Sequence, residues 1–569
     1  MTGRKYSGAW FWGEIKAQKK LYQYAALASL MANIFAFSVS LFSMVVYDRI
    51  LPNAALDSLY SLLFGVLLLL LLDYFVRQVR SELLDYAGKK IDLIISEKLF
   101  KEIILRENNK AKSSSGVSAS IVREFDSLKE FLASATITTF VDIPFSILFL
   151  WMIFLLSSYL VLVPLVSIFI LLLLGWISHR QMRDSAKTMQ GLGHGKQSIM
   201  FECLGAKETI NCLGKDEFFS AKWQEATVSQ NDQAIHSKSV SNRATNWVNL
   251  ITQLNQIALI SVGVLVSSLT GSLVAATLMA GRAIAPFSQV VNLLTRLSQA
   301  IQSYKTISQI LDQEKKSTST GAIDANNLDS SLIFENITIS YAESKSPTVE
   351  NLYMRIEPGD RVAILGRTGS GKTTLIKALL GLVPVNAGHI RLGGVDVRDL
   401  DRDTFLARFG ILLQETHLFK DSVARNITLQ SGLIDGENIM KACEKSGFSD
   451  VLKKLPEGLS TDIGEGGQKL SGGQRRLLAI ARMLYEDKSH IIMDEPTSGL
   501  DQATEMQVID KLNVSLEGKT VIFVTHRPAP LRLANKIAVI ENGKLIEYGL
   551  RDEVIKKLQS NAANQRSGS

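Results

Sequence analysis

Long runs of apolar residues in the first half of the chain constrain its fold more than any other feature. A helix needs about 20 apolar residues to cross the hydrocarbon core of a bilayer, and six stretches reach this length. They lie at about 22–47, 57–76, 131–156, 159–178, 247–269 and 271–294. We therefore expect an α-helical domain with six transmembrane helices over residues 1–312. The apolar fraction of 46% and the mean hydropathy of +0.14 agree with a membrane protein.

The segments between these runs indicate which side of the membrane they face. The connections at 48–57, 157–158 and 270 are short and contain a single basic residue, whereas 77–130 and 178–246 are long, helical in pattern and rich in Lys and Arg. Because Lys and Arg concentrate in cytoplasmic loops, we expect both termini and both long stretches to be cytoplasmic. The same flanking positions account for the net charge of +7. No motif for nucleic-acid binding accompanies that charge.

Three ionisable residues interrupt or border the apolar runs, namely Asp73, Asp142 and Arg282. A charge in the middle of a membrane helix costs at least about 2.5–3.5 kcal/mol, so such side chains usually face a cavity or a partner. We expect Asp73 to lie at the cytoplasmic edge of the membrane. Asp142 and Arg282 are candidates either for the lining of a transport pathway or for a buried ion pair, and the sequence leaves both alternatives open.

The second half of the chain reads as a soluble α/β domain joined to the first by a tether. Residues 313–331 are polar and have no hydrophobic period, which predicts a linker. The segment 332–558 alternates apolar strand-like runs with helical patterns, and we expect 559–569 to be a disordered tail. Free thiols in a reducing compartment are expected for Cys203, Cys212 and Cys443, because their spacing fits neither a metal site nor a disulfide framework.

A glycine-rich segment in this half follows the apolar strand RVAIL and precedes a helical pattern. The sequence GRTGSGKT at 366–373 is the phosphate-binding loop in its expected setting, in which backbone N–H groups and a helix N-terminus surround the phosphates. Lys372 would bind the β- and γ-phosphates, and the Thr373 hydroxyl would bind Mg²⁺. The loop gives these candidate ATP-binding residues: Gly366, Arg367, Thr368, Gly369, Ser370, Gly371, Lys372, Thr373 and Thr374.

A second segment, HIIMDEPTSGLD at 490–501, ends an apolar run with two carboxylates. A buried strand that ends in Asp494 would present this carboxylate to Mg²⁺. Glu495, the next residue, could polarise the attacking water. Taken alone, an apolar run that ends in two carboxylates is weak evidence for a nucleotide site. About 120 residues after a phosphate-binding loop, the same pattern becomes strong evidence for one.

Three further residues complete the predicted site. Gln414 and His526 each follow an apolar strand, and we expect them to reach the γ-phosphate or the metal, with Gln414 as a third Mg²⁺ ligand beside Thr373 and Asp494. Taken alone, polar residues at strand ends are usually solvated turns. The ring of Tyr341 could stack on adenine, or it could be an aromatic residue at a strand edge.

The stretch LSGGQ at 470–474, with RRLLAIARMLYEDKSHIIMDEPTSGLD after it, resembles the signature of ATP-binding cassette (ABC) ATPases over about residues 330–558. The resemblance implies that Tyr341 stacks on adenine, that Gln414 forms the Q-loop, and that Glu495 and His526 are the catalytic carboxylate and the switch histidine. It adds these ATP-binding residues, from the signature loop and the D-loop: Leu470, Ser471, Gly472, Gly473, Gln474 and Asp501.

Six spans ahead of one cassette resemble a half-transporter of the type I ABC exporter fold. The resemblance implies a homodimer in which ATP and Mg²⁺ lie between the phosphate-binding loop of one subunit and the signature loop of the other. It thus explains why one domain would carry two glycine-rich loops about a hundred residues apart.

The membrane half is similar to the permease-ATPases of bacterial type I protein secretion, in the stretches 42–62, 135–150 and 278–296. This similarity implies a multi-pass protein of the bacterial inner membrane with a cytoplasmic cassette. Its partners would be a periplasmic membrane-fusion adaptor, an outer-membrane channel and a secreted protein substrate. Such enzymes usually carry a peptidase-like domain ahead of a WFW segment. This chain begins just before AWFWG at 9–13 and has no cysteine before Cys203, so we do not expect it to cleave a leader peptide.

Two other functions are compatible with parts of the sequence. A half-transporter that exports peptides, lipids or small hydrophobic molecules would have the same cassette, and only the membrane motifs argue against it. A soluble cassette ATPase that acts on nucleic acid conflicts with six membrane spans.

Overall fold

The computed structural model describes residues 9–105, 124–129, 131, 134–266, 270–311, 323–341, 346–430 and 435–567. These residues form two compact units, the first ending at residue 311 and the second beginning at residue 323. Each unit is described separately below.

The first unit is entirely helical. Its α-helices are α1 (Ala9–Ala17), α2 (Lys19–Phe35), α3 (Phe37–Val45), α4 (Leu51–Asn53), α5 (Leu56–Leu105), α7 (Ser134–Leu156), α8 (Leu162–Gly205), α9 (Lys207–Leu213), α10 (Asp216–Val266) and α11 (Thr270–Leu311), and one turn of π-helix spans Val46–Ile50. Six helical stretches of the described residues are long and apolar enough to cross a membrane, which agrees with the six predicted spans. The predicted span residues 132, 133 and 267–269 lie outside the described residues.

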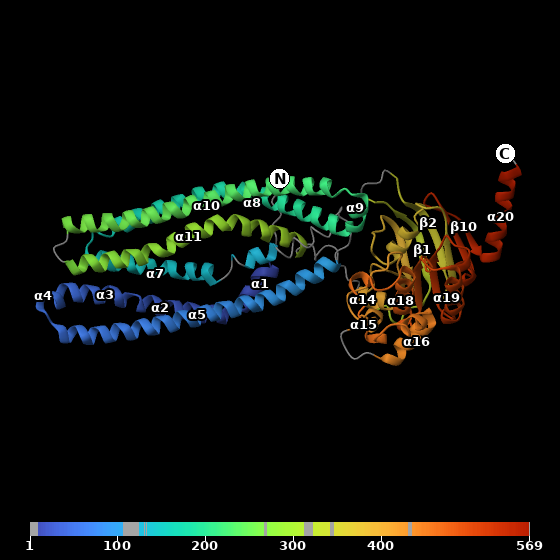
Figure 1. The fold of residues 1–569 in the computed structure, drawn as a ribbon, viewed down its shortest axis with the longest axis horizontal. Helices are drawn as coiled ribbons and strands as arrows, with labels where there is room; N and C mark the ends of the chain where they lie inside the picture. Colours follow the sequence, from blue (N-terminus) through green and yellow to red (C-terminus); the bar gives the residue numbers. More distant parts are fainter. Residues whose placement is uncertain are drawn as a thin grey trace. The chain divides into compact units, whose positions relative to one another are not determined.

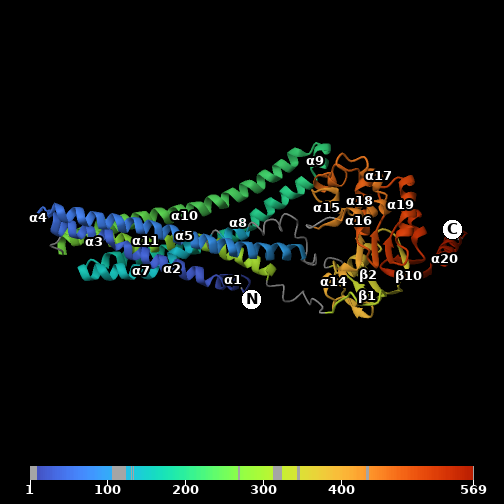
Figure 2. The same ribbon diagram turned by 90° about the horizontal axis from the view of Figure 1, so that it is seen from below.

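Figures 1 and 2 show α5, α8, α10 and α11 of this unit as long helices that continue well beyond the length of a membrane span. Helices α5, α8, α9 and α10 confirm the helical pattern at 77–105 and over most of 178–246. Residues 106–123 of the first basic stretch lie outside the described residues. Many large apolar side chains of α5 point outward, including Phe64, Leu67 and Leu71. An apolar outer surface suits a helix that faces lipid. Inside the unit, small and aliphatic residues of α11 such as Ala276, Met279 and Ala283 are fully buried.

The second unit contains two sheets, labelled in part in Figure 1. The antiparallel sheet has the order β2-β1-β4-β5 and the larger sheet has the order β10-β9-β3-β8-β7-β6. The strands are β1 (Leu332–Ile339), β2 (Val349–Ile356), β3 (Arg361–Leu365), β4 (Ala387–Leu392), β5 (Val395–Asp396), β6 (Phe409–Leu412), β7 (His490–Asp494), β8 (Thr520–Val524), β9 (Lys536–Glu541) and β10 (Lys544–Leu550). Strands β9, β3, β8, β7 and β6 run parallel, so their carboxyl ends meet at one edge.

The α-helices of the second unit are α13 (Lys372–Leu379), α14 (Arg402–Ala407), α15 (Val423–Thr428), α16 (Gly436–Ser446), α17 (Ser449–Leu452), α18 (Gly472–Tyr485), α19 (Gln502–Ser515) and α20 (Arg551–Ser567). Among them, α14, α18 and α20 pack against strands of the larger sheet. Every residue of β7 and β8 is buried, as expected for parallel strands with both faces covered. The α/β architecture expected for this half is therefore present.

The structure corrects both ends of the predicted cassette. The sequence predicts a linker at residues 323–331, yet Ile323 forms a backbone bridge with Leu400, and Ala325 is fully buried in the core. The guanidinium of Arg408 holds this segment by donating to the carbonyls of Ala325 and Leu328, at 2.9 and 2.6 Å. Residues 312–322 of the predicted linker lie outside the described residues. At the other end, α20 continues to Ser567, where a disordered tail was expected.

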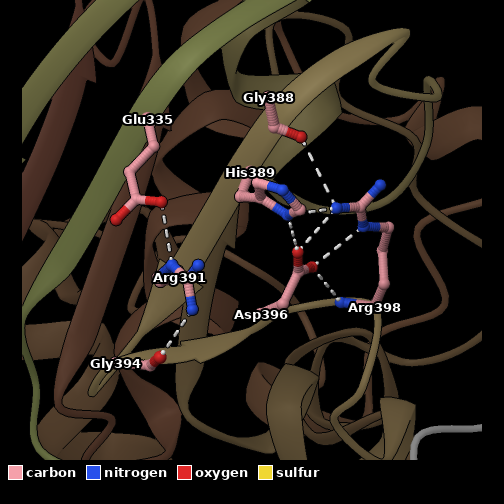
Figure 3. Close-up of polar contacts among 7 residues, drawn as sticks. All are labelled: Glu335, Gly388, His389, Arg391, Gly394, Asp396 and Arg398. Atoms are coloured by element: carbon pink, nitrogen blue, oxygen red, sulfur yellow. Dashed lines mark hydrogen bonds and ion pairs between the residues drawn. The ribbon is translucent and has the colours of Figure 1, made fainter.

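A cluster of charged side chains connects β1, β4 and β5 at the end of the antiparallel sheet (Figure 3). Arg398 donates to both oxygens of Asp396, from Nε at 3.0 Å and from Nη2 at 2.6 Å, and Nδ1 of His389 lies 2.6 Å from Oδ2 of Asp396. On the neighbouring strand pair, Arg391 donates to Glu335 at 2.9 Å. Burial alone would raise the pKa of Asp396, but the hydrogen bonds from Arg398 and His389 outweigh it and hold this pKa well below its usual range.

The lowered pKa predicts how the cluster contributes to stability. Because the carboxylate is favoured in the folded state, its contribution is fully present above the unfolded pKa near 3.9 and is lost as the pH falls through the lower folded pKa. We expect Asp396→Asn to lower the free energy of unfolding by about 2 kcal/mol between pH 5 and 7, and by less below about pH 4. Calorimetry of the full chain should show this deficit, whereas the exposed Asp399→Asn serves as the matched control. An equal deficit at every pH would mean that the charge of Asp396 is not what stabilises the sheet.

Candidate functional site

The predicted phosphate-binding loop joins the end of β3 to the start of α13. Gly366, Gly369 and Gly371 have φ angles of 154°, 83° and 100°, which favour glycine. A Cβ on Gly366 would lie 2.1 Å from the carbonyl oxygen of Ile540, so no larger residue fits there. The backbone of the loop is therefore accessible to a ligand at the edge of the sheet, where Arg367, Thr368 and Gly369 are exposed.

Lys372, the first residue of α13, folds back over this loop. Its ammonium group donates to the carbonyl oxygens of Gly366 and Arg367, at 2.9 and 2.8 Å. Burial lowers the pKa of Lys372, which the nearby carboxylates partly oppose. Among the described residues the Oγ of Ser370 is buried without a hydrogen-bond partner. A buried ammonium, an unsatisfied hydroxyl and an open backbone together fit an anionic ligand such as a phosphate chain.

The two carboxylates at the end of β7 differ in their surroundings. Asp494 is buried at 2% exposure as the last residue of the strand. Glu495, just after it, has a φ of 50°, which is an uncommon conformation for a residue with a side chain and is often found at functional sites. Its Oε1 is buried and accepts no hydrogen bond from the described residues, although Nε2 of His526 lies 3.6 Å away. Burial is the largest cause that raises the pKa of Glu495.

The remaining predicted residues reach the same edge of the sheet from different strands. Gln414 follows β6 and is exposed, and His526 follows β8 with a half-exposed side chain. Because β6, β7, β3 and β8 are parallel, the segments after them lie along one edge, and Thr373 lies in the first turn of α13, which follows β3. Tyr341 is 43% exposed, and its hydroxyl lies 3.3 Å from Oγ1 of Thr374. The ring is thus placed beside the phosphate-binding helix with room for a ligand.

The second glycine-rich loop has a different local structure. Ser471 caps α18 by accepting from the backbone N–H of Gln474 at 3.3 Å, while the Gln474 side chain accepts from the Ser471 N–H at 2.9 Å. Leu470 is buried, whereas Ser471 and Gly472 are exposed. A Cβ on Gly473 would lie 3.2 Å from the carbonyl oxygen of Gly499. Within the part of the chain that the structure describes, no hydrogen bond joins this loop to residues 366–374.

Asp501, predicted to belong to the ATP site, has a clear local partner. Its carboxylate caps α19 by accepting from the N–H and the hydroxyl of Thr504, at 3.0 and 2.6 Å. The hydrogen bonds to Thr504 lower the pKa of Asp501. A role at the nucleotide stays a prediction for this residue.

The sequence reading missed Arg476, in the second turn of α18. This guanidinium is 3% exposed and connects segments that are distant in the sequence. It donates to the carbonyls of Leu413, Gln414, Asp494, Glu495 and Pro496 and to the hydroxyl of Thr416. Burial lowers the pKa of Arg476 to about 10. The available signal was its position among the buried residues of an amphipathic helix, where arginine is rare unless paired.

Arg476 is expected to be a positioning residue for the segments that carry Gln414 and Glu495. Lysine keeps the charge but lacks the planar fork with five N–H donors. We expect Arg476→Lys to lower the free energy of unfolding by about 2 kcal/mol and to lower kcat for ATP hydrolysis. The neighbouring Arg475→Lys, at a less buried position of the same helix, should change neither quantity. Unaltered kcat and stability in Arg476→Lys would show that the planar guanidinium of Arg476 is not needed to position these segments.

The structure also shows the surroundings of the three ionisable residues in the membrane half. Asp142 on α7 accepts from Nδ2 of Asn33 at 2.8 Å and lies 3.6 Å from Nη1 of Arg80. An ion pair of Asp142 with Arg282 is therefore not formed. Arg282 is exposed on α11, so its alternative as a pathway residue stays a prediction. Asp73 pairs with Arg77 one turn away on α5, at 2.9 Å.

Comparisons with known proteins agree with both units. A family model described as the ABC transporter matches residues 349–498, and one described as the ABC transporter transmembrane region matches residues 23–306. A solved structure of a bacterial Atm1-family ABC exporter with ATP bound superimposes with a TM-score of 0.78 at 20% identity, covering 96% of each chain. This last likeness confirms the predicted fold.

Several curated relatives match along nearly the whole chain. The cyclolysin secretion/processing ATP-binding protein CyaB of Bordetella pertussis is 26% identical over 556 residues, which are 97% of this chain and 78% of that protein. The alpha-hemolysin translocation ATP-binding protein HlyB of Escherichia coli O157:H7 is 27% identical over 571 residues, 98% of this chain and 79% of that protein. The toxin RTX-I translocation ATP-binding protein of Actinobacillus pleuropneumoniae is 26% identical, with coverages of 97% and 78%.

These matches confirm the resemblance that was read from the signature and the membrane motifs. The matched residues contain helices α3, α4, α5, α7, α8, α9 and α10 of the first unit in full, and also the phosphate-binding loop of the second unit. The chain therefore belongs to the ABC transporters, as a multi-pass membrane protein that carries its own ATP-hydrolysing domain.

Proposed function

We propose that this protein is the permease and ATPase of a type I secretion system, which uses ATP to export a protein substrate across the bacterial inner membrane. The observation that carries the proposal is the match over 97% or more of the chain to proteins named for the secretion or translocation of cyclolysin, hemolysin and RTX toxin. The motifs of the membrane half, which led to the same family, support it. The lipid or small-molecule exporter has no such support.

The membrane orientation follows from charge. The long stretches 77–130 and 178–246 carry most of the Lys and Arg of the membrane half, and such loops stay in the cytoplasm. The cassette follows the sixth span and is cytoplasmic in the same orientation. The protein then takes its substrate from the cytoplasm, and a periplasmic adaptor and an outer-membrane channel would continue the path.

Each residue of the candidate site has a role that follows from its surroundings. The ammonium of Lys372 would exchange its two carbonyl partners for oxygens of the β- and γ-phosphates, and the N–H groups of the loop would bind the same phosphates. Glu495 would accept a proton from the attacking water, and His526 would hold the γ-phosphate beside it. The ring of Tyr341 would stack on adenine.

The carboxylate of Asp494, the hydroxyl of Thr373 and the amide oxygen of Gln414 are the groups that would hold Mg²⁺. When bound, Mg²⁺ neutralises the charge that develops on the phosphate oxygens. No group of three His, Cys, Asp or Glu side chains able to hold a metal occurs among the described residues. Mg²⁺ in phosphate sites is usually held by one or two protein carboxylates together with substrate oxygens and water, so this donor set fits.

The export of protein can be tested in proteoliposomes that contain the full chain. Inside-out vesicles should accumulate an unfolded acidic polypeptide in an ATP-dependent manner and should not accumulate a fluorescent phospholipid. Lys372→Ala should reduce this uptake about a hundredfold or more, because the phosphates lose their main cation. Lys377→Ala, a change in the last turn of the same helix, is the matched control. Transport of the phospholipid instead of the polypeptide would contradict the proposal.

A further inference from the structure

Glu505 is a buried carboxylate in the first turn of α19, in the second unit. The residue is 4% exposed. Carboxylates are seldom buried to this degree unless they are paired, because an unpaired charge away from water is costly. The partners of Glu505 therefore indicate what this burial achieves.

Glu505 contacts two different segments of the chain through one oxygen. The hydroxyl of Thr497 donates to Oε1 of Glu505 at 2.5 Å, and Nη1 of Arg527 lies 2.9 Å from the same oxygen. The same Nη1 also donates to the carbonyl oxygen of Thr497 at 2.9 Å. Each of the three residues thus contacts the other two, and we call this group the Glu505 triangle.

The triangle joins segments that carry two residues of the candidate site. Thr497 is the second residue after Glu495, in the segment that follows β7. Arg527 is the residue directly after His526, in the segment that follows β8. Because Glu495 and His526 each lie within two residues of a member of the triangle, its contacts limit how far these two side chains can separate.

Backbone contacts hold the same two segments at the point where they leave the sheet. The N–H of Glu495 donates to the carbonyl oxygen of Val524 at 2.9 Å, next to the last paired residues of β7 and β8. Beyond this bond, the contact of Arg527 with Thr497 links the segments through a side chain. The buried hydroxyl of Thr525 accepts from the N–H of Arg527 at 3.1 Å, which fixes the turn after β8.

The triangle also closes the loop that carries Asp501. Thr497 and Glu505 stand at the two ends of residues 498–504, so the bond between their side chains holds these ends together. Helix α19 in turn packs against the 3₁₀ turn Ala529–Leu533, which follows β8. The start of α19 is therefore tied to the segments on both sides of it.

The separation of Glu495 and His526 is the quantity that these contacts control. Nε2 of His526 lies 3.6 Å from Oε1 of Glu495, slightly beyond the length of a hydrogen bond. The imidazole is half-exposed, so its place depends largely on the backbone that carries it. A displacement of about 1 Å at a reacting centre lowers a rate about a hundredfold.

We propose that Glu505 and Arg527 are positioning residues for ATP hydrolysis, which hold His526 at its distance from Glu495 through the Glu505 triangle. The inference rests on the proposed function, from which it takes the roles of Glu495 and His526. The side chain of Glu505 is 6% exposed, so it acts through Arg527 and not by contact with the nucleotide. Removing either partner of a buried ion pair leaves the other charge uncompensated, which favours rearrangement of the segments that carry it.

The test compares kcat and KM for ATP in the full chain, reconstituted in lipid nanodiscs. Glu505→Gln keeps the shape of the side chain and removes its charge, whereas Arg527→Met removes both contacts of the guanidinium. Each variant should lower kcat about tenfold or more and change KM for ATP by less than about twofold. Arg527→Lys keeps the charge and should retain more activity than Arg527→Met. The control Asp510→Asn breaks an exposed ion pair between α19 and Arg532 and should leave kcat unchanged.

Double variants show whether the effect passes through His526. If the triangle acts by placing the imidazole, Glu505→Gln should lower kcat in the wild-type background and have no further effect on single-turnover hydrolysis in His526→Ala. A loss by the same factor in both backgrounds would mean a general structural role and would contradict the inference. Thermal unfolding identifies a variant that fails to fold, and Thr497→Val, which removes one bond of the triangle, then takes its place.

Two further outcomes separate the inference from the proposed function. Wild-type kcat in both Glu505→Gln and Arg527→Met, together with a low kcat in His526→Ala, would contradict the triangle alone and leave the proposed function standing. Wild-type kcat in His526→Ala would contradict the role that the proposed function gives to His526, and the inference with it. A raised KM at unchanged kcat would assign Glu505 and Arg527 to ATP binding and would also overturn the inference.

Discussion

Replacing Glu495 with glutamine is expected to lower kcat for ATP hydrolysis about a hundred- to ten-thousandfold while ATP binding is retained. Glutamine has nearly the same shape but cannot accept the proton of the attacking water. The buried Oε1 of Glu495 accepts no hydrogen bond from the described residues, so this oxygen is available to a water molecule. The phosphate-binding loop is unchanged in this variant. ATP should therefore remain bound, and the protein should accumulate in its ATP-bound state.

The pH dependence provides a second measurement. Because the pKa of Glu495 is raised, chiefly by burial, the base becomes protonated at a higher pH than an ordinary glutamate near 4.3. The rate should fall as the pH decreases through this raised pKa, and the acid limb should be absent from the residual activity of Glu495→Gln. Glu517→Gln, which changes an exposed carboxylate after α19, is the control. A wild-type rate in Glu495→Gln would require a different base.

The parts of the fold that repeat a simple pattern could be predicted from the sequence. The six apolar runs predict six membrane-spanning helices because a helix needs a minimum length to cross a bilayer. The strand RVAIL followed by GRTGSGKT predicts β3 and α13, because strand composition and glycine spacing are local signals. The parallel order of β3, β8 and β7 then brought Asp494, His526 and Lys372 to one edge. None of these inferences needed knowledge of side-chain contacts.

Three features that the sequence did not predict have a common physical origin, since each depends on a contact between residues distant in the sequence. Ile323 forms an isolated backbone bridge with Leu400, and Ala325 is fully buried, yet no pattern in the polar stretch around these two residues indicates either contact. All acceptors of Arg476 except the hydroxyl of Thr416 are backbone carbonyls, which every residue type carries and which the sequence therefore does not reveal. Likewise, nothing in the sequence of α7 indicates that Arg80 of α5 would be the basic neighbour of Asp142.

The two glycine-rich loops differ in a way that favours use by two different subunits. Lys372 and the glycines of the first loop enclose a space for phosphates, whereas the exposed Ser471 at the start of α18 has its own capping bonds and no hydrogen bond to the first loop among the described residues. An exposed helix N-terminus can bind the phosphates of a nucleotide that another subunit holds. We propose that the protein is a homodimer with two such composite sites.

A dimer that combines one Lys372→Ala subunit with one Ser471→Arg subunit tests this arrangement. One of its composite sites carries both lesions, and the other joins an intact phosphate-binding loop to an intact signature loop. Each mutant homodimer has two damaged sites. Nucleotide trapped by vanadate in purified mixed dimers is the appropriate measurement, since full turnover requires both sites in many two-site enzymes. We expect trapping at about half of the wild-type amount in the mixed dimer, by the count of intact sites, and none in either homodimer. If both loops instead served one nucleotide within a subunit, every site in the mixture would be damaged, and mixed dimers shown to have assembled would trap nothing.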